Sequence, residues 1–550
     1  MNNKEKNYFI SKYLIMAYAK LGVNYAFVSP GSRNTPLILA LSDQKKIKSY
    51  NIIDERSSGY MALGISKMNN QPSLLVTTSG TAVSNLFPSI VEAYMSSVPM
   101  IILTADRPRH LVGTGSNQTI NQYKIFNNYV NNFIDFSDIK NFDCETIINI
   151  AIDSYIKSTT HSKGPVHINI PFDLPLHINQ RPKIQINNNK LFTFDLNNNF
   201  KNQYKMPDFK KYLKPIIVCT NNKNLNIVST AKKYNIPIFM ECRGSRFSKK
   251  CDNIISSYEF ILNNNIINPD LILRFGDKPI SNILNKFLEK RTDITYLITE
   301  SVFNDNAKNI IECKTSIFLE EFNKYDFKYD IIWLNNFIKK QNKIKKYINN
   351  FFNIPIEHEG YIINKIISIV PSNSNLMIGN SSPIRDLDKF TFNNASKINI
   401  FANRGASGID GIISTSIGLS INQEKYNFLI LGDISFFYDL SALMNQSQVC
   451  VNLNIIILNN GGGHIFDRLE GLSEEKDYSK YWLTPLNLNI KDAAKAFQCN
   501  YLKLNYKSLA SKDASIFSNL GINLIEIEID SSNHQLENEA INKRLKKELV

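Results

Sequence analysis

Continuous apolar runs of strand length recur along the chain and alternate with helical stretches. Examples are Phe428–Leu431 and the centre of "KPIIVCT" at 214–220. A strand that is apolar on both faces needs cover on both, as a parallel sheet between two layers of helices provides. The alternation therefore predicts an α/β protein built from doubly wound parallel sheets. A chain of 550 residues has room for roughly two to four such domains.

The strand-like runs fall into three segments. The first segment has runs in 25–37, 73–106 and 164–173; the middle segment has them in 214–220, 236–242, 270–277 and 294–300; the last has them in 375–382, 429–466 and 523–530. An Asn-rich, weakly periodic stretch from Gln180 to Pro207 predicts a linker. We expect a second linker between Lys339 and Pro355, although 331–350 is helical in pattern. These breaks predict domains at 1–180, 207–340 and 355–550.

Composition argues against several classes of protein. A hydrophobic content of 43% and a charged content of 20% are typical of a soluble globular protein, and the longest apolar runs have only strand length. We therefore expect no membrane insertion. The opening "MNNKEKNYFISKYLIMAYAK" predicts an amphipathic helix rather than a signal peptide. Seven scattered cysteines without a CxxC predict neither zinc nor disulfides, which fits a cytoplasmic protein.

The net charge of +14 raises the question of an anionic partner. The lysines are scattered, however, and form no stripe with interleaved aromatic residues, so we expect no nucleic-acid partner. A phosphate-binding GxxxxGK[ST] motif is absent, and "GTGSNQ" at 113–118 lacks the third glycine and the preceding strand of a dinucleotide fingerprint. That stretch is predicted to be a loop.

Two neighbouring strand-like runs within 429–466 each end in an oxygen-bearing side chain. The first run ends at Asp433, and the second ends at Asn460, directly before Gly461–Gly463. Asp433 and Asn460 are 27 residues apart, about the length of a βαβ unit, and Tyr438–Gln448 is the expected crossover helix. Parallel strands place their carboxyl ends at one edge of a sheet, so we expect the two side chains to converge there.

A carboxylate, an amide oxygen and a loop carbonyl form a hard, all-oxygen ligand set of the kind that Mg²⁺ prefers. The glycines would let the backbone approach a bound group closely. The alternative is that Asp433 caps the next helix and that Asn-Gly-Gly is an ordinary turn. The spacing alone leaves both interpretations open.

Four further loops carry polar or charged side chains that a purely structural role does not readily explain. They are "SPGSRNTP" with Ser32 and Arg33, "DERSSGYM" with Glu55, "GNSSPIRD" with Ser381 and Arg385, and "NRGASGIDG" with Arg404 and Ile409. Taken singly, Glu55 could be a charge at a helix N-terminus and Ile409 could be core. Their occurrence beside a Mg²⁺-type loop favours a shared ligand site.

The stretch from Asp433 to Asn460 resembles the thiamine-diphosphate motif, Gly-Asp followed by about two dozen residues and Asn-Asn. In addition, "SPGSRNTPL", "DERSSGYMALG", "TTSGTAVSNLFPSIVEA", "LTADRP", "GSNQTINQ" and "NRGASGIDG" resemble the 2-succinyl-5-enolpyruvyl-6-hydroxy-3-cyclohexene-1-carboxylate synthase family of the menaquinone pathway. The match is dense in the first and last thirds of the chain and weak in the middle third.

The resemblance implies a pyrimidine-binding domain, a central domain and a diphosphate-binding domain. It implies thiamine diphosphate as cofactor, with Mg²⁺, or Mn²⁺, held by Asp433, Asn460 and the Gly462 carbonyl. The flanking Gly432, Ile434 and Ser435 would belong to the same cofactor site. Ile434 stands where many thiamine-diphosphate enzymes have glycine, but its side chain is not a ligand.

The resemblance also implies roles for Glu55 and Ile409. Glu55 would hydrogen-bond the aminopyrimidine nitrogen and favour the imino tautomer that removes the thiazolium proton. Ile409 would bend the cofactor. Each active site would lie between two chains, Glu55 coming from one and Asp433 from the other, in a homodimer or a tetramer.

The implied substrates are 2-oxoglutarate and isochorismate, both dicarboxylates. The first would lose CO₂, and the resulting succinyl carbanion would add to the second. Candidate carboxylate readers are Arg33, Arg107, Arg385 and Arg404. Neutral hydrogen bonds would come from Ser32, Asn117, Gln118 and Ser381, and an apolar wall from Phe466. In the middle segment Asn282 stands where family members often have a basic residue; Lys278 or Lys286 could compensate, or the contact could be absent.

Two other interpretations stay open at this point. Another thiamine-diphosphate decarboxylase or carboligase, such as an acetolactate synthase-like enzyme, would need an apolar pocket for a methyl group, whereas four loop arginines favour more highly charged substrates. A non-catalytic cofactor-binding protein would need the metal loop but not Glu55.

Overall fold

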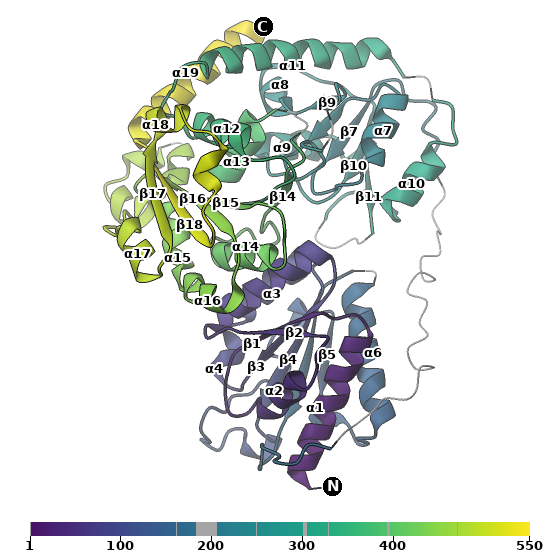
Figure 1. The fold of residues 1–550 in the computed structure, drawn as a ribbon. Helices are drawn as coiled ribbons and strands as arrows, with labels where there is room; N and C mark the ends of the chain where they lie inside the picture. The colour runs from purple at the N-terminus through teal and green to yellow at the C-terminus, as the bar shows by residue number, and fades with distance from the viewer. Residues whose placement is uncertain are drawn as a thin grey trace. The chain divides into compact units, whose positions relative to one another are not determined.

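The computed structural model describes residues 2–160, 162–182, 206–248, 250–300, 305–327, 329–392, 396–469 and 471–549. This part of the chain contains three six-stranded sheets, and every strand pair in them is parallel. The predicted α/β class with parallel sheets is thereby confirmed (Figure 1). Most of the expected linker, 183–205, lies outside the described residues. No described helix has both the length and the apolar character needed to cross a membrane.

The first sheet has the strand order β2-β1-β3-β4-β6-β5. Its strands are β1 (Tyr25–Val28), β2 (Lys48–Asn51), β3 (Ser73–Thr77), β4 (Met100–Asp106), β5 (Asn132–Asp135) and β6 (Pro165–Pro171). Its helices are α1 (Asn3–Lys20), α2 (Thr35–Ser42), α3 (Glu55–Asn69), α4 (Thr81–Ser84), α5 (Phe87–Met95) and α6 (Cys144–Thr159). The expected N-terminal helix is thus α1, and a capping box between Asn2 and Glu5 fixes its start.

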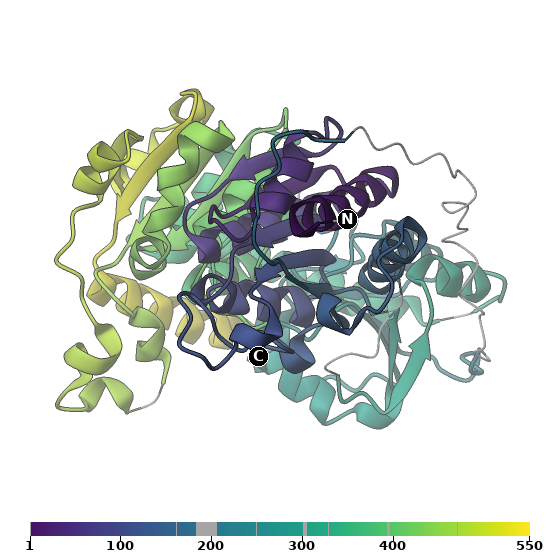
Figure 2. The ribbon, with the colours of Figure 1, turned by 90° about the horizontal axis from the view of Figure 1, so that it is seen from below.

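Alternate residues of the central strands of this sheet face different helices. Leu74 and Val76 pack in one core with residues of α1, α2 and α6. Leu75, which points the other way, lies beneath α3, where a Cβ at Gly59 would be 3.7 Å from it. Helices therefore cover both faces, as the continuous apolar runs require. Figures 1 and 2 show α1 in purple beside the strands of this sheet.

Contacts divide the chain into two compact units, of which the first comprises Met1–Phe200, Asn403–Gln423 and Tyr438–Val451. Within it, α14 (Ile412–Ser420) packs closely against α3. A Cβ at Gly64 would lie 2.2 Å from the Thr415 carbonyl oxygen, and one at Gly418 would lie 2.1 Å from that of Met61. Only glycine permits this separation between the two helices.

The second unit comprises Lys201–Ala402, Glu424–Phe437 and Asn452–Val550 and contains two sheets. One sheet has the strand order β12-β11-β10-β7-β8-β9. Its strands are β7 (Pro215–Cys219), β8 (Ile238–Met240), β9 (Ile254–Ile255), β10 (Leu271–Phe275), β11 (Thr295–Thr299) and β12 (Asn309–Glu312). The other sheet has the strand order β14-β13-β15-β16-β18-β17. Its strands are β13 (Asn375–Ile378), β14 (Asn399–Phe401), β15 (Asn427–Gly432), β16 (Leu453–Asn459), β17 (Asn500–Asn505) and β18 (Ile522–Glu528).

The helices of the second unit include α11 (Ile331–Phe351), which agrees with the helical pattern at 331–350. The others are α7 (Asn226–Lys233), α8 (Tyr258–Asn264), α9 (Asn282–Glu289), α10 (Thr315–Phe322), α12 (Glu359–Ile369), α13 (Ser382–Phe390), α17 (Ile490–Ala496), α18 (Tyr506–Ala510) and α19 (Ser531–Leu549). The short helices α15 (Asp433–Tyr438) and α16 (Gln446–Val449) lie on the connection from β15 to β16. The domain boundaries expected from the sequence stay a prediction.

Candidate functional site

Asp433 and Asn460 directly follow two adjacent parallel strands. β15 pairs with β16, and Gly432 lies opposite Leu458 at the carboxyl end of the pair. The spacing argument predicts this arrangement correctly. The connection differs from the single helix expected over Tyr438–Gln448, because it consists of α15, a 3₁₀ helix at Leu440–Asn445 and α16.

The interruption falls at Asp439, within the first unit. Its buried carboxylate accepts hydrogen bonds from the Ser414 backbone N, at 2.7 Å, and from Ser414 Oγ, at 3.1 Å. The Asp439 backbone, with φ −112° and ψ 27°, departs from helical values, while its side chain is hydrogen-bonded to another segment. Periodicity alone does not reveal such a distant partner.

The Asp433 carboxyl group is buried, and its burial has an electrostatic cost. Its Oδ1 accepts from the Ile434 backbone N at 2.9 Å, and the Gly461 backbone also hydrogen-bonds to the carboxylate. Burial nevertheless raises the pKa of Asp433 to about 6. The protein's own donors therefore compensate the charge incompletely, and a cation at this position would stabilise it.

Asn460 presents an amide oxygen that has no hydrogen-bond partner. Its Nδ2 donates to Glu359 Oε1 at 2.8 Å, while its buried Oδ1 accepts no hydrogen bond from the described residues. Leaving a buried acceptor unsatisfied costs roughly 1–3 kcal/mol. A metal ion would satisfy both Asn460 Oδ1 and Asp433, so the residues present fit a divalent cation.

Glu359, the first residue of α12, orients Asn460 and is not predicted by the sequence patterns. Burial, followed by the neighbouring Asp386, raises the pKa of Glu359 to about 8. The carboxyl group is also hydrogen-bonded to Asp386. The sequence shows only an acidic residue at the start of a mostly apolar stretch, which by itself predicts a charge at a helix N-terminus.

The glycine run after Asn460 is required by backbone conformation at Gly461 and by close packing at Gly462. Gly461 and Gly462 have φ values of 78° and 150°. A Cβ at Gly462 would lie 2.5 Å from the Leu483 carbonyl oxygen, which also accepts a hydrogen bond from Gly463 N at 2.7 Å. The loop is therefore fixed, with its conformation depending on glycine.

Glu55 begins α3 in the first unit but does not cap it. The cap is Asp54, whose Oδ1 accepts from Arg56 N at 2.9 Å and whose Oδ2 accepts from Ser441 Oγ at 2.6 Å. Glu55 is half-buried, and Oε2 is 3.4 Å from Asn85 Nδ2. The neighbouring aspartate performs the capping, and Glu55 lies in the first turn of α3, so its alternative role as a charge at the helix N-terminus stays open.

Arg33 and Arg107 are buried in the same region of the first unit. Arg33 Nη1 donates to the Phe172 carbonyl at 2.6 Å, and its buried Nε has no partner among the described residues. Arg107 donates to Ser79 Oγ at 2.6 Å and to the Asn117 carbonyl at 3.0 Å. Burial, with Arg107 as the next cause, lowers the pKa of Arg33. No ion pair of either arginine occurs in the described part of the chain, so the pair is suited to an anion.

The polar residues expected beside these arginines lie on exposed loops. Ser32, Asn117 and Gln118 are exposed, and Gln118 has a φ of 55°. Its carbonyl oxygen accepts from Ser79 Oγ at 3.0 Å, the hydroxyl that also binds Arg107. The loop is thus tied to the buried arginine, and its side chains are accessible to a ligand.

The loop that carries Arg404 and Ile409 is held by a buried glutamate. Glu92 accepts from the backbone N of Gly405 at 3.0 Å and of Ala406 at 2.7 Å. Ile409 is only half-buried, which disfavours an ordinary core role. Beyond it, Asp410 accepts a hydrogen bond from the Tyr60 hydroxyl. Both ends of the loop are therefore fixed within the first unit.

In the second unit, Ser381 and Arg385 lie between β13 and the first turns of α13. Ser381 has a φ of 72°, a strained value for a non-glycine residue and one often found at ligand sites. Arg385 donates to the Ser381 carbonyl at 2.5 Å. Phe466, proposed as an apolar wall, is 36% exposed.

A cavity of about 170 Å³ lies beside Arg385 and is lined by Asn282, Asp386, Lys389 and Arg468, among others. Neither Lys278 nor Lys286 belongs to its lining, and both are exposed. The contact expected near Asn282 therefore stays open, with an absent contact among the alternatives. The lining also includes Arg468, from the loop after β16, which the sequence patterns do not predict.

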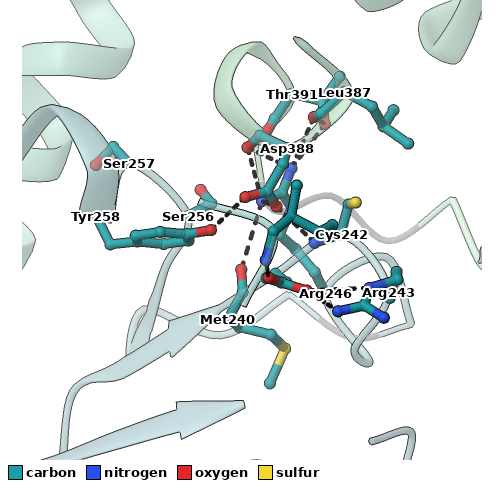
Figure 3. A network of polar contacts seen from close by, with 12 residues as sticks. Met240, Cys242, Arg243, Arg246, Ser256, Ser257, Tyr258, Leu387, Asp388 and Thr391 are labelled. Carbon is teal, nitrogen blue, oxygen red and sulfur yellow. Dashed lines mark hydrogen bonds and ion pairs between the residues drawn. The ribbon is translucent and has the colours of Figure 1, made fainter. Parts of the chain in front are cut away.

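A buried polar network anchors α13 at its carboxyl end (Figure 3). Asp388 accepts from Arg246 Nη1 at 3.1 Å, from Cys242 N at 2.7 Å and from the Tyr258 hydroxyl. Arg246, which is fully buried, also donates to the Thr391 carbonyl at 2.7 Å. Removing one partner from such a network leaves the other uncompensated, so these contacts hold α13 rigidly.

Comparisons with known proteins identify a matching domain family and several relatives of this chain. Residues 10–125 match the model of the N-terminal TPP-binding domain of thiamine pyrophosphate enzymes. Three relatives are called 2-succinyl-5-enolpyruvyl-6-hydroxy-3-cyclohexene-1-carboxylate synthase. The relative from Bacillus pumilus is 31% identical to this chain, and the alignment covers the full length of both proteins. The relative from Listeria monocytogenes serotype 4b is 32% identical, over 94% of this chain and 94% of its own length. The relative from Trichodesmium erythraeum is 30% identical, over 94% of this chain and 95% of its own length.

Proposed function

The chain belongs to the 2-succinyl-5-enolpyruvyl-6-hydroxy-3-cyclohexene-1-carboxylate synthase family of thiamine-diphosphate enzymes, and we propose that its substrates are 2-oxoglutarate and isochorismate. The reaction releases CO₂ from the first substrate and joins the remaining four-carbon unit to the ring of the second, as a transferase step of menaquinone biosynthesis. The observation that carries the substrate proposal is the pair of buried arginines, Arg33 and Arg107, that have no carboxylate partner among the described residues. The unsatisfied Asn460 oxygen and the buried Asp433 carboxylate, at the ends of adjacent strands, support the metal and the cofactor.

Bound thiamine diphosphate supplies the nucleophilic carbon and the electron sink that decarboxylation of a 2-oxo acid requires. Asp433, Asn460 and the Gly462 carbonyl would hold Mg²⁺, or Mn²⁺, against the diphosphate, while Gly432, Ile434 and Ser435 would line the same loop. Glu55 would hydrogen-bond the aminopyrimidine ring nitrogen and so control a proton at that atom. The half-buried Ile409 would support the cofactor.

Substrate binding is assigned to the arginines and their polar neighbours. Arg33 and Arg107 lack carboxylate partners among the described residues and are available for a substrate carboxylate. Arg385 and Arg404 would bind further carboxylate oxygens. Ser32, Asn117, Gln118, Ser381 and Phe466 would complete the substrate site.

We further propose a homodimer or a tetramer in which Glu55 of one chain serves the same active site as Asp433 of the partner subunit. The support for this is the family resemblance. A cytoplasmic location stays a prediction from composition.

The proposal is tested by incubating the protein with thiamine diphosphate, Mg²⁺, 2-oxoglutarate and isochorismate while following CO₂ and the adduct. Pyruvate in place of 2-oxoglutarate tests the acetolactate synthase-like alternative. Preference for pyruvate would replace the proposed substrates, and cofactor binding without turnover of either acid would favour a non-catalytic protein.

Arg385→Met and Arg404→Met should each reduce kcat/KM for 2-oxoglutarate by about 10- to 150-fold. A charge-assisted hydrogen bond contributes roughly 1.5–3 kcal/mol, and methionine keeps the bulk without the guanidinium. Pyruvate lacks the distal carboxylate, so its slower turnover should change much less. Equal losses on both acids would contradict carboxylate reading by these residues.

Glu359→Ala should weaken Mn²⁺ binding in the presence of thiamine diphosphate by about 10- to 100-fold, the usual effect of removing a group that orients a metal ligand. The Asn460 amide would lose its acceptor and its fixed orientation. Glu359→Gln keeps an acceptor oxygen and should restore most of the affinity, as measured by electron paramagnetic resonance of free Mn²⁺. Identical behaviour of the two variants would show that Glu359 does not position Asn460.

A further inference from the structure

A buried glutamine links the turn after β3 to strands β4 and β6 of the first unit. Gln122 is 1% exposed, and its Oε1 accepts from the Gly80 backbone N at 2.9 Å. Its Nε2 donates to Asn169 Oδ1 at 2.9 Å and to the Ala105 carbonyl at 3.3 Å. Both N–H groups of the amide and one of its acceptor positions are thus used inside the protein. Gln122 therefore acts on protein groups and not directly on a ligand.

The turn that Gln122 holds also orients Arg107. Ser79 Oγ accepts from Arg107 Nη1 at 2.6 Å and donates to the Gln118 carbonyl at 3.0 Å. Gly80 has a φ of 83°, and a Cβ there would lie 2.9 Å from Gln118 Cγ. The turn and the Gln118 loop are in close contact, so a shift of the Gly80 backbone would move the hydroxyl that holds the guanidinium.

Arg107 is oriented by two acceptors and keeps donors for a ligand. Besides the bond to Ser79, its Nη2 donates to the Asn117 carbonyl at 3.0 Å. No further hydrogen bond of the Arg107 side chain occurs among the described residues. Since a guanidinium has five N–H groups in a fixed plane, the two acceptors determine the direction in which the remaining donors point.

Asn169 anchors the other end of Gln122. Its Nδ2 donates to Asp106 Oδ2 at 2.9 Å and to Asp135 Oδ2 at 3.2 Å, and all of these side chains are buried. Asp106 Oδ1 in turn accepts from the Arg107 backbone N at 2.7 Å. The network therefore holds the backbone of Arg107 from below and its side chain through the Gly80 turn. A closed buried network of this kind is rigid because each group depends on its partners.

Loss of the Gln122 amide would act mainly on the Gly80 side. Asn169 Oδ1 would still accept from Thr104 Oγ1, which lies 2.9 Å away. The buried Gly80 N–H, by contrast, would lose its side-chain acceptor. An unsatisfied buried donor is costly, so the turn would shift to find another partner.

We propose that Gln122 is a positioning residue of the substrate site, which fixes the Ser79–Gly80 turn so that Arg107 keeps the orientation in which it binds a substrate carboxylate. The inference rests on the proposed function, which places Arg107 in the substrate site. If Gln122 acts through Arg107, its contribution to substrate binding should disappear once the guanidinium is removed.

The test is a double-mutant cycle on the full-length protein with thiamine diphosphate and Mg²⁺, in which the KM values of 2-oxoglutarate and isochorismate are measured separately. Gln122→Met keeps the size of the side chain and removes its hydrogen bonds. It should raise, by about 10-fold, the KM of the same substrate whose KM rises in Arg107→Met, and change kcat by less than about 3-fold. Added to Arg107→Met, it should change that KM by less than about 2-fold.

A conservative variant and a control separate positioning from stability. A buried carboxyl group facing Asn169 Oδ1 would be protonated, so Gln122→Glu can replace both hydrogen bonds and should restore most of the KM. Ser158→Ala removes a buried hydroxyl that donates to the Gly164 carbonyl at 2.8 Å, near Met100 at the amino end of β4. It should lower thermal stability and leave both KM values unchanged, because Arg107 follows the opposite end of that strand.

Hydrogen exchange gives a measurement that does not depend on turnover. Without substrate, exchange in the peptide around Gly80 should be faster in Gln122→Met and unchanged in Ser158→Ala, as mass spectrometry can follow. If thermal unfolding shows that Gln122→Met has lost its fold, Ser79→Ala takes its place in the cycle, because it breaks the same link to Arg107.

The outcomes separate this inference from the proposed function. Failure of the wild type to join the two substrates would overturn the proposed function and, with it, the substrate role of Gln122. An active wild type would overturn the positioning role alone if Gln122→Met changed neither KM, raised the KM of the other substrate, or added its full effect to that of Arg107→Met.

Discussion

Asp433→Ala is expected to abolish Mg²⁺-dependent retention of thiamine diphosphate, with a loss of affinity of at least about 10²-fold. Asp433 supplies the only formal negative charge among the three proposed metal ligands, and its burial leaves that charge poorly compensated by the protein. Equilibrium dialysis of the cofactor at fixed Mg²⁺ measures the effect. Raising Mg²⁺ should not restore binding fully, because the coordinating oxygen itself has been removed.

Two variants distinguish a metal ligand from a helix cap. Asp433→Asn keeps a side-chain oxygen that can accept from the Ile434 backbone N, so it preserves the cap but not the charge. It should therefore fold normally and still bind cofactor weakly. Glu474→Ala, in the same unit, is a carboxylate control. Unchanged cofactor affinity in Asp433→Ala would reduce the residue to a cap at the start of α15.

The central strands of the sheets are predictable from the sequence, and the outermost strands are not. Strands β7 and β15 coincide with continuous apolar runs because they are covered on both faces. Strands β5 and β17 lie at sheet edges and contain "NFID" and "NYLKLN", which lack such a run. The same holds for β9, β12 and β14, which have two to four residues. An edge strand has one pairing partner and less cover, so its apolar signal is weak.

In the candidate site, too, features set by nearby sequence are predictable, whereas contacts between residues far apart in the sequence are not. The position of Asp433 next to Asn460 follows from strand spacing, because parallel pairing fixes where strand ends meet. Glu359 lies 101 residues from the Asn460 that it orients, and Asp386 lies 82 residues from Arg468. No periodicity links such pairs. They arise from burial, which forces polar groups to find partners wherever the fold brings them.

Glu55→Gln should bind thiamine diphosphate and Mg²⁺ with nearly normal affinity but turn over 2-oxoglutarate at least about 10²-fold more slowly. Glutamine has almost the same size and can still hydrogen-bond Asn85, so the start of α3 should be preserved. It lacks the ionisable group that controls the proton on the aminopyrimidine nitrogen. Proton exchange at the reactive carbon of the bound cofactor should slow in parallel, which nuclear magnetic resonance after acid quench can follow.

Asp54→Asn is the matched control, because it changes the neighbouring residue that caps α3. The substitution should lower the thermal stability of the protein and affect proton exchange little.

Mixing Glu55→Gln with Asp433→Ala then tests the shared site. If subunits exchange, each mixed dimer should regain one site with both residues intact, and activity should rise above that of either variant alone. Near-normal turnover by Glu55→Gln would remove its assigned role, and full activity in a demonstrated monomer would exclude a site completed by a partner subunit.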